Sequence, residues 1–315
     1  MRVAVVGGGP VGETLCARLL AAGNDVILAE IDARLRERIA RDGIVLRGAH
    51  ELRVPSPRLV ASIDELADTE VDIVFVAVKA TATELVGSAV ADSCPADSTV
   101  VSWQNGIDTE RMLLRVGVQR VVRAAINHGV SIADDGAVLV SFEHPPHLVR
   151  EFHPDGTERA VDVARLLTAS GLQTERAEEL EPAVWTKAAL NCALNAVCAL
   201  TGLTLHEAWH DTYAGTLARS VLRETIQVAR ANEIFLGSGF YRYCLDYLSA
   251  AGNHKPSMLL DREAGRRSEI DYINGKVVEY GQVAGIPTPH NEALVALIKA
   301  AERASRQMHR AKEKE

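Results

Sequence analysis

The sequence predicts an α/β domain with a parallel sheet over residues 1–178, followed by an all-helical domain over residues 179–315. In the first part, short runs rich in Val and Ile alternate with helical patterns, which is typical of parallel strands joined by helices. Glycines at a fixed spacing join the first strand to the first helix. Beyond about residue 178 the strand runs stop and long helical patterns follow, so the second part is expected to be helical.

The composition predicts a soluble protein. A chain of 315 residues with 47% hydrophobic residues has room for two domain cores. The formal net charge of −8 argues against nucleic acid as a partner, and no apolar run approaches the roughly 18 residues of a membrane span. The five cysteines are scattered and lack a C-x-x-C pair, so we expect a cytoplasmic protein without disulfides or a cysteine-ligated metal.

The elements of the first domain follow from the apolar pattern. Residues 137–156 interrupt the alternation and predict two strands around a proline loop, and residues 172–178 are expected to close the sheet. The other predicted strands are residues 2–7, 25–30, 71–79, 98–106 and 120–129, with helices at residues 11–23 and 34–43.

The second domain shows helical periodicity in long segments separated by Gly, Pro and Asn. These segments begin at residue 181 and continue at residues 217–234, 268–285 and 290–310. The charged tail, residues 306–315, is expected to be a solvated, frayed helix end. The long apolar faces allow either a homodimer through this domain or packing of the helices on each other.

The segment "GGGPVG" carries the first candidate site. Gly7, Gly9 and Gly12 have G-x-G-x-x-G spacing directly after a strand and before a helix, and Pro10 and Val11 complete the turn. The first glycine permits the tight turn, the second lets the backbone approach a pyrophosphate, and the third lets helix and strand pack closely. This context predicts a dinucleotide-binding, Rossmann-type domain.

The second strand ends at Glu30, about twenty residues beyond the glycines. A carboxylate there can accept hydrogen bonds from the ribose hydroxyls of the adenosine and would repel a 2′-phosphate. The sequence therefore predicts NAD rather than NADP, although Arg34 and Arg36 lie close enough to leave NADP open.

Two further polar residues follow apolar strands. Lys79 follows "DIVFVAV" and Asn105 follows "TVVSWQ". In open parallel sheets, ligands bind outside the carboxyl ends of the strands. Lys79 and Asn105 are therefore predicted to line a site near the nicotinamide.

The segment "KAALNCALNAVCALTG" is apolar apart from a recurring polar position. Lys187, Asn191 and Asn195 are spaced by four and fall within roughly 80° of one another on a helix. Buried amides need polar partners, and a binding cleft supplies them. A lysine beside a ketone can donate the proton that accompanies hydride transfer, so Lys187 is the predicted general acid.

Over nearly the whole chain the sequence resembles ketopantoate reductases and their relatives. The resemblance rests on "GGGPVG", "VAVKA", "WQNG", "VWTKAALNCALNAV" and "RRSEIDYINGKVVEYGQVAGIPTP", in family order. It implies a Rossmann domain followed by a helical domain, and reduction of a small 2-keto acid by a nicotinamide cofactor bound in the intervening cleft.

The resemblance also implies roles for single residues. Lys187 matches the catalytic lysine, and Glu269 matches the acidic residue that positions and tunes it; such a partner favours the ammonium form of a lysine. Lys79 and Asn105 match positions at the junction of cofactor and substrate. The residues that match substrate-binding positions are Asn191, Asn195 and Ser257.

The chain departs from the family pattern at positions that concern the substrate. Leu205 stands where an asparagine is usual ten residues beyond Asn195, and His254 stands where another asparagine commonly precedes the substrate serine. Glu30 departs from the NADPH preference common in the family. The resemblance as a whole predicts the 2-keto acid reaction class, and these departures leave the substrate open.

Other interpretations fit some of the same residues. The fold could serve another carbonyl or imine, as in opine formation, or sense a dinucleotide without turnover; the pair Lys187 and Glu269 argues against a sensor. "HEAWH", from His206 to His210, fits a zinc-binding spacing, but the sequence offers no third ligand and we expect no metal. His128 at a strand end is an alternative acid.

Overall fold

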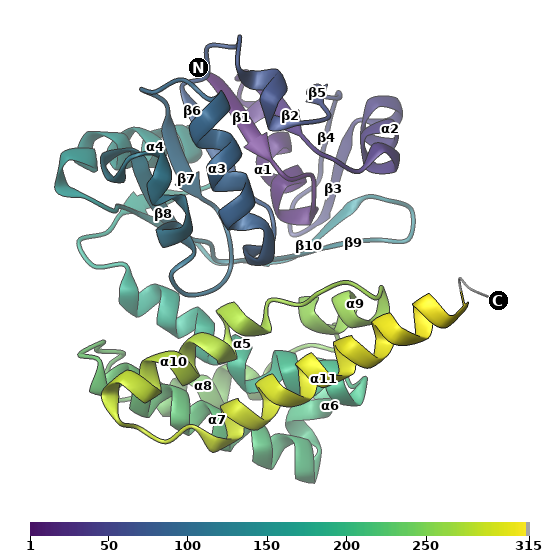
Figure 1. Ribbon diagram of the computed structural model, residues 1–315, viewed down its shortest axis with the longest axis vertical. Coiled ribbons are helices and arrows are strands. Elements are labelled where there is room, and N and C mark those ends of the chain that lie inside the picture. Colours follow the sequence, from purple (N-terminus) through teal and green to yellow (C-terminus); the bar gives the residue numbers. More distant parts are fainter. Residues whose placement is uncertain (313–315) are drawn as a thin grey trace. The chain divides into compact units, whose positions relative to one another are not determined.

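The computed structural model describes residues 1–312, so the end of the predicted frayed tail, residues 313–315, lies outside the described residues. The chain divides into two compact units, Met1–Leu180 and Glu181–Glu315 (Figure 1). This division falls two residues after the boundary expected from the sequence.

The first unit is a mixed α/β structure, as predicted. Its helices and strands, in chain order, are β1 (Arg2–Val6), α1 (Pro10–Ala21), β2 (Asp25–Ala29), α2 (Ala33–Asp42), β3 (Ile44–Gly48), β4 (Leu52–Val54), β5 (Arg58–Val60), η1 (Ile63–Leu66), β6 (Ile73–Val76), η2 (Ala80–Ala82), α3 (Thr83–Ser93), β7 (Thr99–Ser102), η3 (Thr109–Val116), η4 (Val118–Arg120), β8 (Val121–Ala125), β9 (His128–Ile132), β10 (Val138–Glu143), β11 (His147–Glu151), η5 (Pro154–Gly156), α4 (Thr157–Ala169) and β12 (Thr174–Arg176).

Within residues 1–312, eight strands form the main sheet in the order β12-β11-β8-β7-β6-β1-β2-β5. The pairs from β8 to β5 are all parallel, which confirms the predicted parallel sheet. β11 runs antiparallel to β8, and β12 adds to β11 as the outer strand, so residues 172–178 do close the sheet. The chain leaves β1 towards β2 on one side and returns to β6 on the other, which places a topological switch point beside β1.

A second, four-stranded sheet in the described residues has the order β4-β3-β10-β9 and was not predicted. The two strands expected around the proline loop exist, but they belong to different sheets: β10 pairs with β3 and β9, whereas β11 joins the main sheet. The pairing of β3 with β10 joins residues about ninety positions apart, from Leu46 with Val138 to Gly48 with Val140. Local periodicity carries no information on such a pairing.

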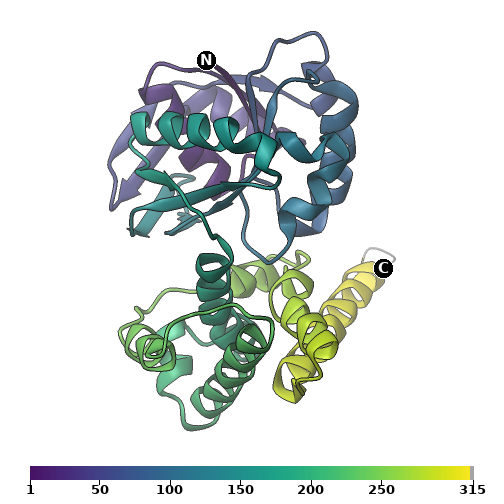
Figure 2. The ribbon, with the colours of Figure 1, turned by 90° about the vertical axis from the view of Figure 1, so that its left-hand side faces the viewer.

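The main sheet is buried on both faces. Alternate residues of β1 point to different cores: Val3 and Val5 belong to a cluster with residues of α1, α4 and the second sheet, and Ala4 and Val6 to a cluster with residues of α3 and the 3-10 helix η3. Figure 2 shows the teal helix α4 and the blue helix α3 on opposite sides of the sheet. Burial on both faces explains the continuous apolar runs in the sequence.

The second unit is helical in its described residues, as predicted. Its elements are α5 (Glu181–Thr201), α6 (Leu205–His210), α7 (Thr212–Ala231), α8 (Phe240–Ser249), α9 (Ser257–Glu263), η6 (Ile270–Tyr272), α10 (Asn274–Ala284) and α11 (Pro289–Lys312). Helix α5 packs against α6, α7, α9 and α11 and so forms the centre of the unit. By length and composition α5 could cross a membrane, but 61% of its most apolar window is buried, and the core helix of a soluble protein passes the same test.

Buried polar groups join the helices of this unit. Glu224 of α7 accepts hydrogen bonds from the backbone N–H groups of His290 and Asn291, at 3.0 Å each, and so caps the start of α11. Asn274, at the start of α10, donates to the carbonyl oxygen of Cys192 in α5 and to the side chain of Asn291. Burial raises the pKa of Glu224, but the hydrogen bonds outweigh it and hold that pKa below its usual value.

Helix α1 carries a buried carboxyl group near its start. The side chain of Glu13 is fully buried and pairs with Arg38 of α2. Burial raises the pKa of Glu13 to about 7, and the attraction of Arg38 only partly opposes this.

This raised pKa predicts a pH-dependent stability. A carboxyl group that binds its proton more tightly in the folded protein stabilises it at low pH. Glu13 should therefore lower the free energy of unfolding as pH rises from about 4.5 to about 7, by up to about 3 kcal/mol. In Glu13→Gln this loss should disappear, so denaturant titrations at pH 4.5 to 8 should show the variant gaining on the wild type. Glu37→Gln, an exposed site on α2, is the control; a constant difference between Glu13→Gln and wild type would contradict the prediction.

Candidate functional site

The glycine segment forms the turn between β1 and α1. Gly7 has a positive φ of 104°, and a Cβ on Gly12 would lie 1.9 Å from the carbonyl oxygen of Gly7, so both positions require glycine. Around Gly9 no atom from elsewhere in the described chain lies within 4 Å of where a Cβ would be. Gly9 also caps α1 without a side-chain hydrogen bond, which leaves the first N–H groups of a twelve-residue helix for an anion. The turn therefore fits a pyrophosphate.

Glu30 lies beside this turn. Its carboxylate accepts hydrogen bonds from the backbone N–H of Gly8, at 2.6 Å, and of Asp32, at 2.8 Å. Arg36 donates to the carbonyl oxygen of Glu30 at 2.6 Å, whereas Arg34 is exposed. Glu30 thus places a negative charge next to the glycine turn, and the nearby guanidinium of Arg36 is held by the backbone.

Lys79 and Asn105 lie on the same edge of the sheet as the glycine turn. The strands β1, β6 and β7 are neighbours, and their ladders continue one residue beyond the strand ends: Ala77 N–H donates to Val6 and Trp103 N–H to Val76. Lys79 precedes the 3-10 helix η2, and Asn105 lies in the turn after β7; both side chains are half-buried. The structure therefore groups Lys79, Asn105, Glu30 and the glycine turn along one edge.

A buried polar network behind this edge was not predicted from the sequence. Gln104 donates to the carbonyl oxygen of Val78 at 2.7 Å and to the hydroxyl of Thr83 at 2.6 Å, and so ties the turn that carries Asn105 to the turn that carries Lys79. Arg123 of β8 donates to the carbonyl oxygens of Gln104 and Gly106. The available signal was a charged residue inside the apolar strand "VVRAA", where an unpaired charge would be costly.

His128 lies in a cluster with Glu143 and His147, whose possible ligand atoms are within 4.8 Å of one another. His50 adds an imidazole 3.0 Å from Glu143. The backbone N–H of Asn127 donates to Nδ1 of His147 at 3.0 Å, which puts the proton of a neutral imidazole on Nε2. In this tautomer Nε2 of His147 carries a proton and offers no free lone pair to a metal, which argues against a three-ligand metal site here.

The second unit carries a polar stripe on helix α5, formed by Lys187, Asn191 and Asn195. Lys187 and Asn191 are half-buried, and Asn195 is 6% exposed. The intervening residues Cys192 and Leu194 are fully buried, so the stripe runs along the core helix itself. A buried amide and a half-buried ammonium on one face of such a helix call for polar partners, which a bound ligand would supply.

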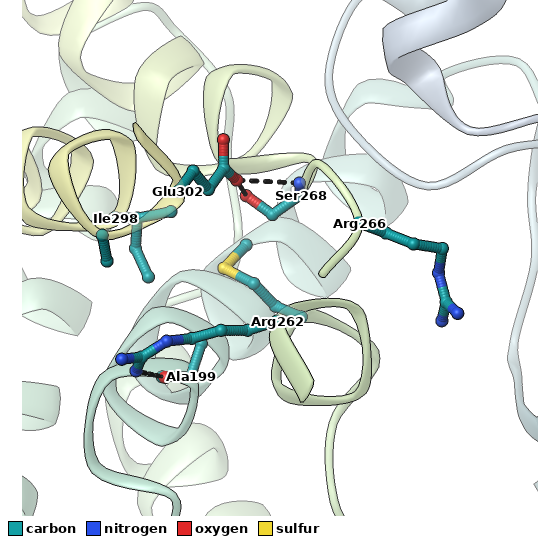
Figure 3. A pocket seen from close by; sticks show the side chains of 8 residues that line it. Ala199, Arg262, Arg266, Ser268, Ile298 and Glu302 are labelled. Atoms are coloured by element: carbon teal, nitrogen blue, oxygen red, sulfur yellow. Dashed lines mark hydrogen bonds between the residues drawn. The ribbon is translucent and has the colours of Figure 1, made fainter. Parts of the chain in front are cut away.

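Glu269 and Ser257 belong to neighbouring parts of the same unit. Glu269 is buried and precedes η6, whereas Ser257 is the exposed first residue of α9. Glu302 of α11 accepts hydrogen bonds from Ser268 through its backbone N–H at 2.8 Å and its hydroxyl at 2.7 Å, which fixes the residue before Glu269 (Figure 3). The pocket in Figure 3 adjoins Ser268 but is not lined by Lys187 or Glu269, so it is separate from the predicted site.

Leu205 and His254, which depart from the family pattern near the expected substrate, are neighbours in the structure. The backbone N–H of Leu205 donates to the carbonyl oxygen of His254 at 3.2 Å. The following helix begins with a capping box in which Glu207 accepts hydrogen bonds from Thr204, so the glutamate of "HEAWH" has a structural role. The structure thus brings the two unusual positions together, which sequence separation alone does not reveal.

Comparison with known proteins identifies the family. Residues 3–147 match the family model described as ketopantoate reductase PanE/ApbA, and residues 179–302 match the model of its C-terminal part. The chain is 30% identical over 305 residues to a 2-dehydropantoate 2-reductase of Archaeoglobus fulgidus, covering 96% of this chain and 98% of the relative. A 2-dehydropantoate 2-reductase of Pyrococcus horikoshii is 25% identical over 303 residues, with the same coverage of both chains.

Solved structures agree with this assignment. A PanE/ApbA family ketopantoate reductase from Ralstonia eutropha is 27% identical, with a TM-score of 0.86 over 97% of this chain and 100% of that chain. A D-mandelate dehydrogenase solved with NADH and anilino(oxo)acetate has a TM-score of 0.87 over 97% of this chain and 99% of that chain; at 23% identity it shows the fold alone. The chain belongs to the ketopantoate reductase family of oxidoreductases.

Proposed function

We propose that the protein reduces a 2-keto acid to the 2-hydroxy acid with a nicotinamide dinucleotide. The observation that carries the proposal is the polar stripe of α5: a lysine and two amides on one face of the central helix, in a chain of the ketopantoate reductase family. A lysine supplies a proton and the amides supply hydrogen bonds, and reduction of a keto acid needs both.

The first unit supports the cofactor part of the proposal. The backbone of the glycine turn and the open start of α1 would hold the pyrophosphate, in particular Gly7, Gly9 and Gly12, together with Pro10 and Val11. Lys79 and Asn105 would line the end of the site where the nicotinamide and the substrate meet. When bound, the reduced nicotinamide supplies the hydride.

The second unit supports the acid–base part. Lys187 Nζ would donate a proton to the carbonyl oxygen of the substrate as this oxygen becomes a hydroxyl, and its positive charge would stabilise the oxygen before the proton arrives. Asn191, Asn195 and Ser257 would orient the substrate. The carboxylate of Glu269, held in place by the Ser268–Glu302 hydrogen bonds, would favour the ammonium form of Lys187.

Two finer points belong to the same proposal. The carboxylate of Glu30 beside the glycine turn favours NAD over NADP, because it would repel a 2′-phosphate. Leu205 and His254, which lie together where family members have asparagines, favour a substrate with a less polar side chain than ketopantoate. The cytoplasmic location and the homodimer stay predictions.

The proposed reaction predicts a measurable turnover. The purified protein should oxidise NADH, and NADPH more slowly, in the presence of one or more members of a panel of branched, aromatic and short 2-keto acids. Apolar side chains should give higher kcat/KM than ketopantoate. Absorbance at 340 nm measures the oxidation of both cofactors in the same assay. Inactivity with every keto acid would contradict the proposal.

Replacing Lys187 tests the proton donor. Lys187→Ala should lower kcat by roughly a hundredfold or more, because the proton must then come from water. Lys299→Ala, at an exposed lysine of α11, is the control and should keep the wild-type kcat. Near-full activity of Lys187→Ala would transfer the role to another group, with His128 the next residue to replace.

Replacing Glu30 tests the cofactor preference. Glu30→Gln keeps an oxygen acceptor for the N–H of Gly8 and removes the charge. The ratio of kcat/KM for NADPH to that for NADH should rise about tenfold, which corresponds to about 1.4 kcal/mol of lost repulsion. Glu37→Gln should leave the ratio unchanged, and an unchanged ratio in Glu30→Gln as well would show that Glu30 does not select the cofactor.

A further inference from the structure

Arg123 is a buried arginine that holds the turn carrying Asn105. It lies in the middle of β8 and is 6% exposed. Its guanidinium donates to the carbonyl oxygens of Gln104, at 2.9 Å, and Gly106, at 2.8 Å, and also contacts the carbonyl and hydroxyl of Ser102 at 3.3 and 3.2 Å. The backbone is therefore fixed by one side chain immediately before and immediately after Asn105.

The charge of Arg123 is balanced within the same cluster. Its Nε lies 3.3 Å from a carboxylate oxygen of Glu110. Burial raises the pKa of Glu110, and the nearby guanidinium opposes this. Taking two charges out of water costs several kcal/mol per ion, so apolar residues in place of both Arg123 and Glu110 would often be no less stable than the pair. Stability alone thus gives a weak reason for an arginine here.

Gln104 extends the same network to the turn that carries Lys79. The Gln104 side chain accepts from the hydroxyl of Ser102 and donates to the carbonyl oxygen of Val78, the residue before Lys79. One network therefore reaches the backbone beside both of the polar residues at this edge of the sheet.

Arg120, three residues earlier, offers a comparison within the same structure. It is 5% exposed and donates to the carbonyl oxygens of Pro95, Ser98 and Val116 at 2.7 to 3.0 Å. Ser98 precedes β7, so these bonds lie at the amino-terminal end of that strand, whereas Arg123 acts at its carboxyl-terminal end. The two arginines resemble each other in burial and bonding and differ in what they hold.

We propose that Arg123 is a positioning residue of the active site: it fixes the backbone around Asn105 and, through Gln104, the backbone before Lys79. The inference rests on the proposed function, in which Asn105 and Lys79 meet the cofactor and the substrate. The side chain of Arg123 acts through Asn105 and Lys79 and need not touch the cofactor or the substrate. A misplacement of about 1 Å in such a group can cost about a hundredfold in rate.

The experiment compares the two arginines. Both Arg123→Met and Arg120→Met should lower the melting temperature, because each leaves several buried carbonyl oxygens without a donor. The loss should be larger for Arg123→Met, because it also removes the partner of the Glu110 carboxylate. Well below the melting temperature, Arg123→Met should lower kcat/KM for the best keto acid about a hundredfold and raise the Kd for NADH about tenfold. Arg120→Met should stay within about threefold of the wild type in both. The milder changes Arg123→Lys and Arg120→Lys keep the comparison if a Met variant does not fold, and Arg123→Lys should recover part of the activity.

A double-mutant cycle with Asn105 separates positioning from a general loss of structure. In the Asn105→Ala background, Arg123→Met should cost about tenfold rather than a hundredfold, because Asn105 is gone and only the link through Gln104 to the backbone before Lys79 remains. Equal losses of kcat/KM in the Arg120 and Arg123 variants would overturn the inference. Fully additive losses of kcat/KM in the double-mutant cycle would overturn it as well. If the wild type reduces no keto acid, the proposed function fails, and the Kd for NADH still decides whether Arg123 shapes the edge of the sheet.

Discussion

The structure of the first unit depends on the register of four parallel strands. Val6 of β1 is the partner of Ala29 in β2 and of Val76 in β6, and Val76 is in turn the partner of Ser102 in β7. These are the last residues of their strands. Because the strands end in register, the segments that follow them come to lie along one line, and this line is where the glycine turn, Glu30, Lys79 and Asn105 are found.

Buried polar side chains then fix the backbone of the turns, which the strand pairing does not hold. The strand ladders hold the turns only at their first residues, and the remaining carbonyl groups need other donors. Arg123 and Gln104 supply these donors at the carboxyl edge, as Arg120 does at the opposite edge. The second unit uses the same principle, with Glu224 capping α11 and Asn274 joining three helices. Each of these groups would be costly if it were unpaired, so together they favour a single arrangement.

Helix α5 combines two roles that usually conflict. It is the central helix of its unit, and it also carries Lys187, Asn191 and Asn195 on one face. A stripe on a core helix has little freedom to move, since the apolar residues beside it are packed on the neighbouring helices. The catalytic lysine of the proposed reaction would therefore be held by the central helix of the unit, as a positioned proton donor requires.

The sequence by itself determined the fold class, the parallel order of strands and helices, and the candidate residues at strand ends and on α5. These follow from periodicity and from glycine chemistry, which act over a few residues and can be read locally. Only the tertiary structure decided the second sheet, the separation of β10 from β11, the network of Arg123 and Gln104, and the contact of Leu205 with His254. The pairing of β3 with β10, the bonds of Arg123 and Gln104 to neighbouring turns, and the contact of Leu205 with His254 join segments 17 or more residues apart. No local pattern in the chain records which partner will be chosen over such distances.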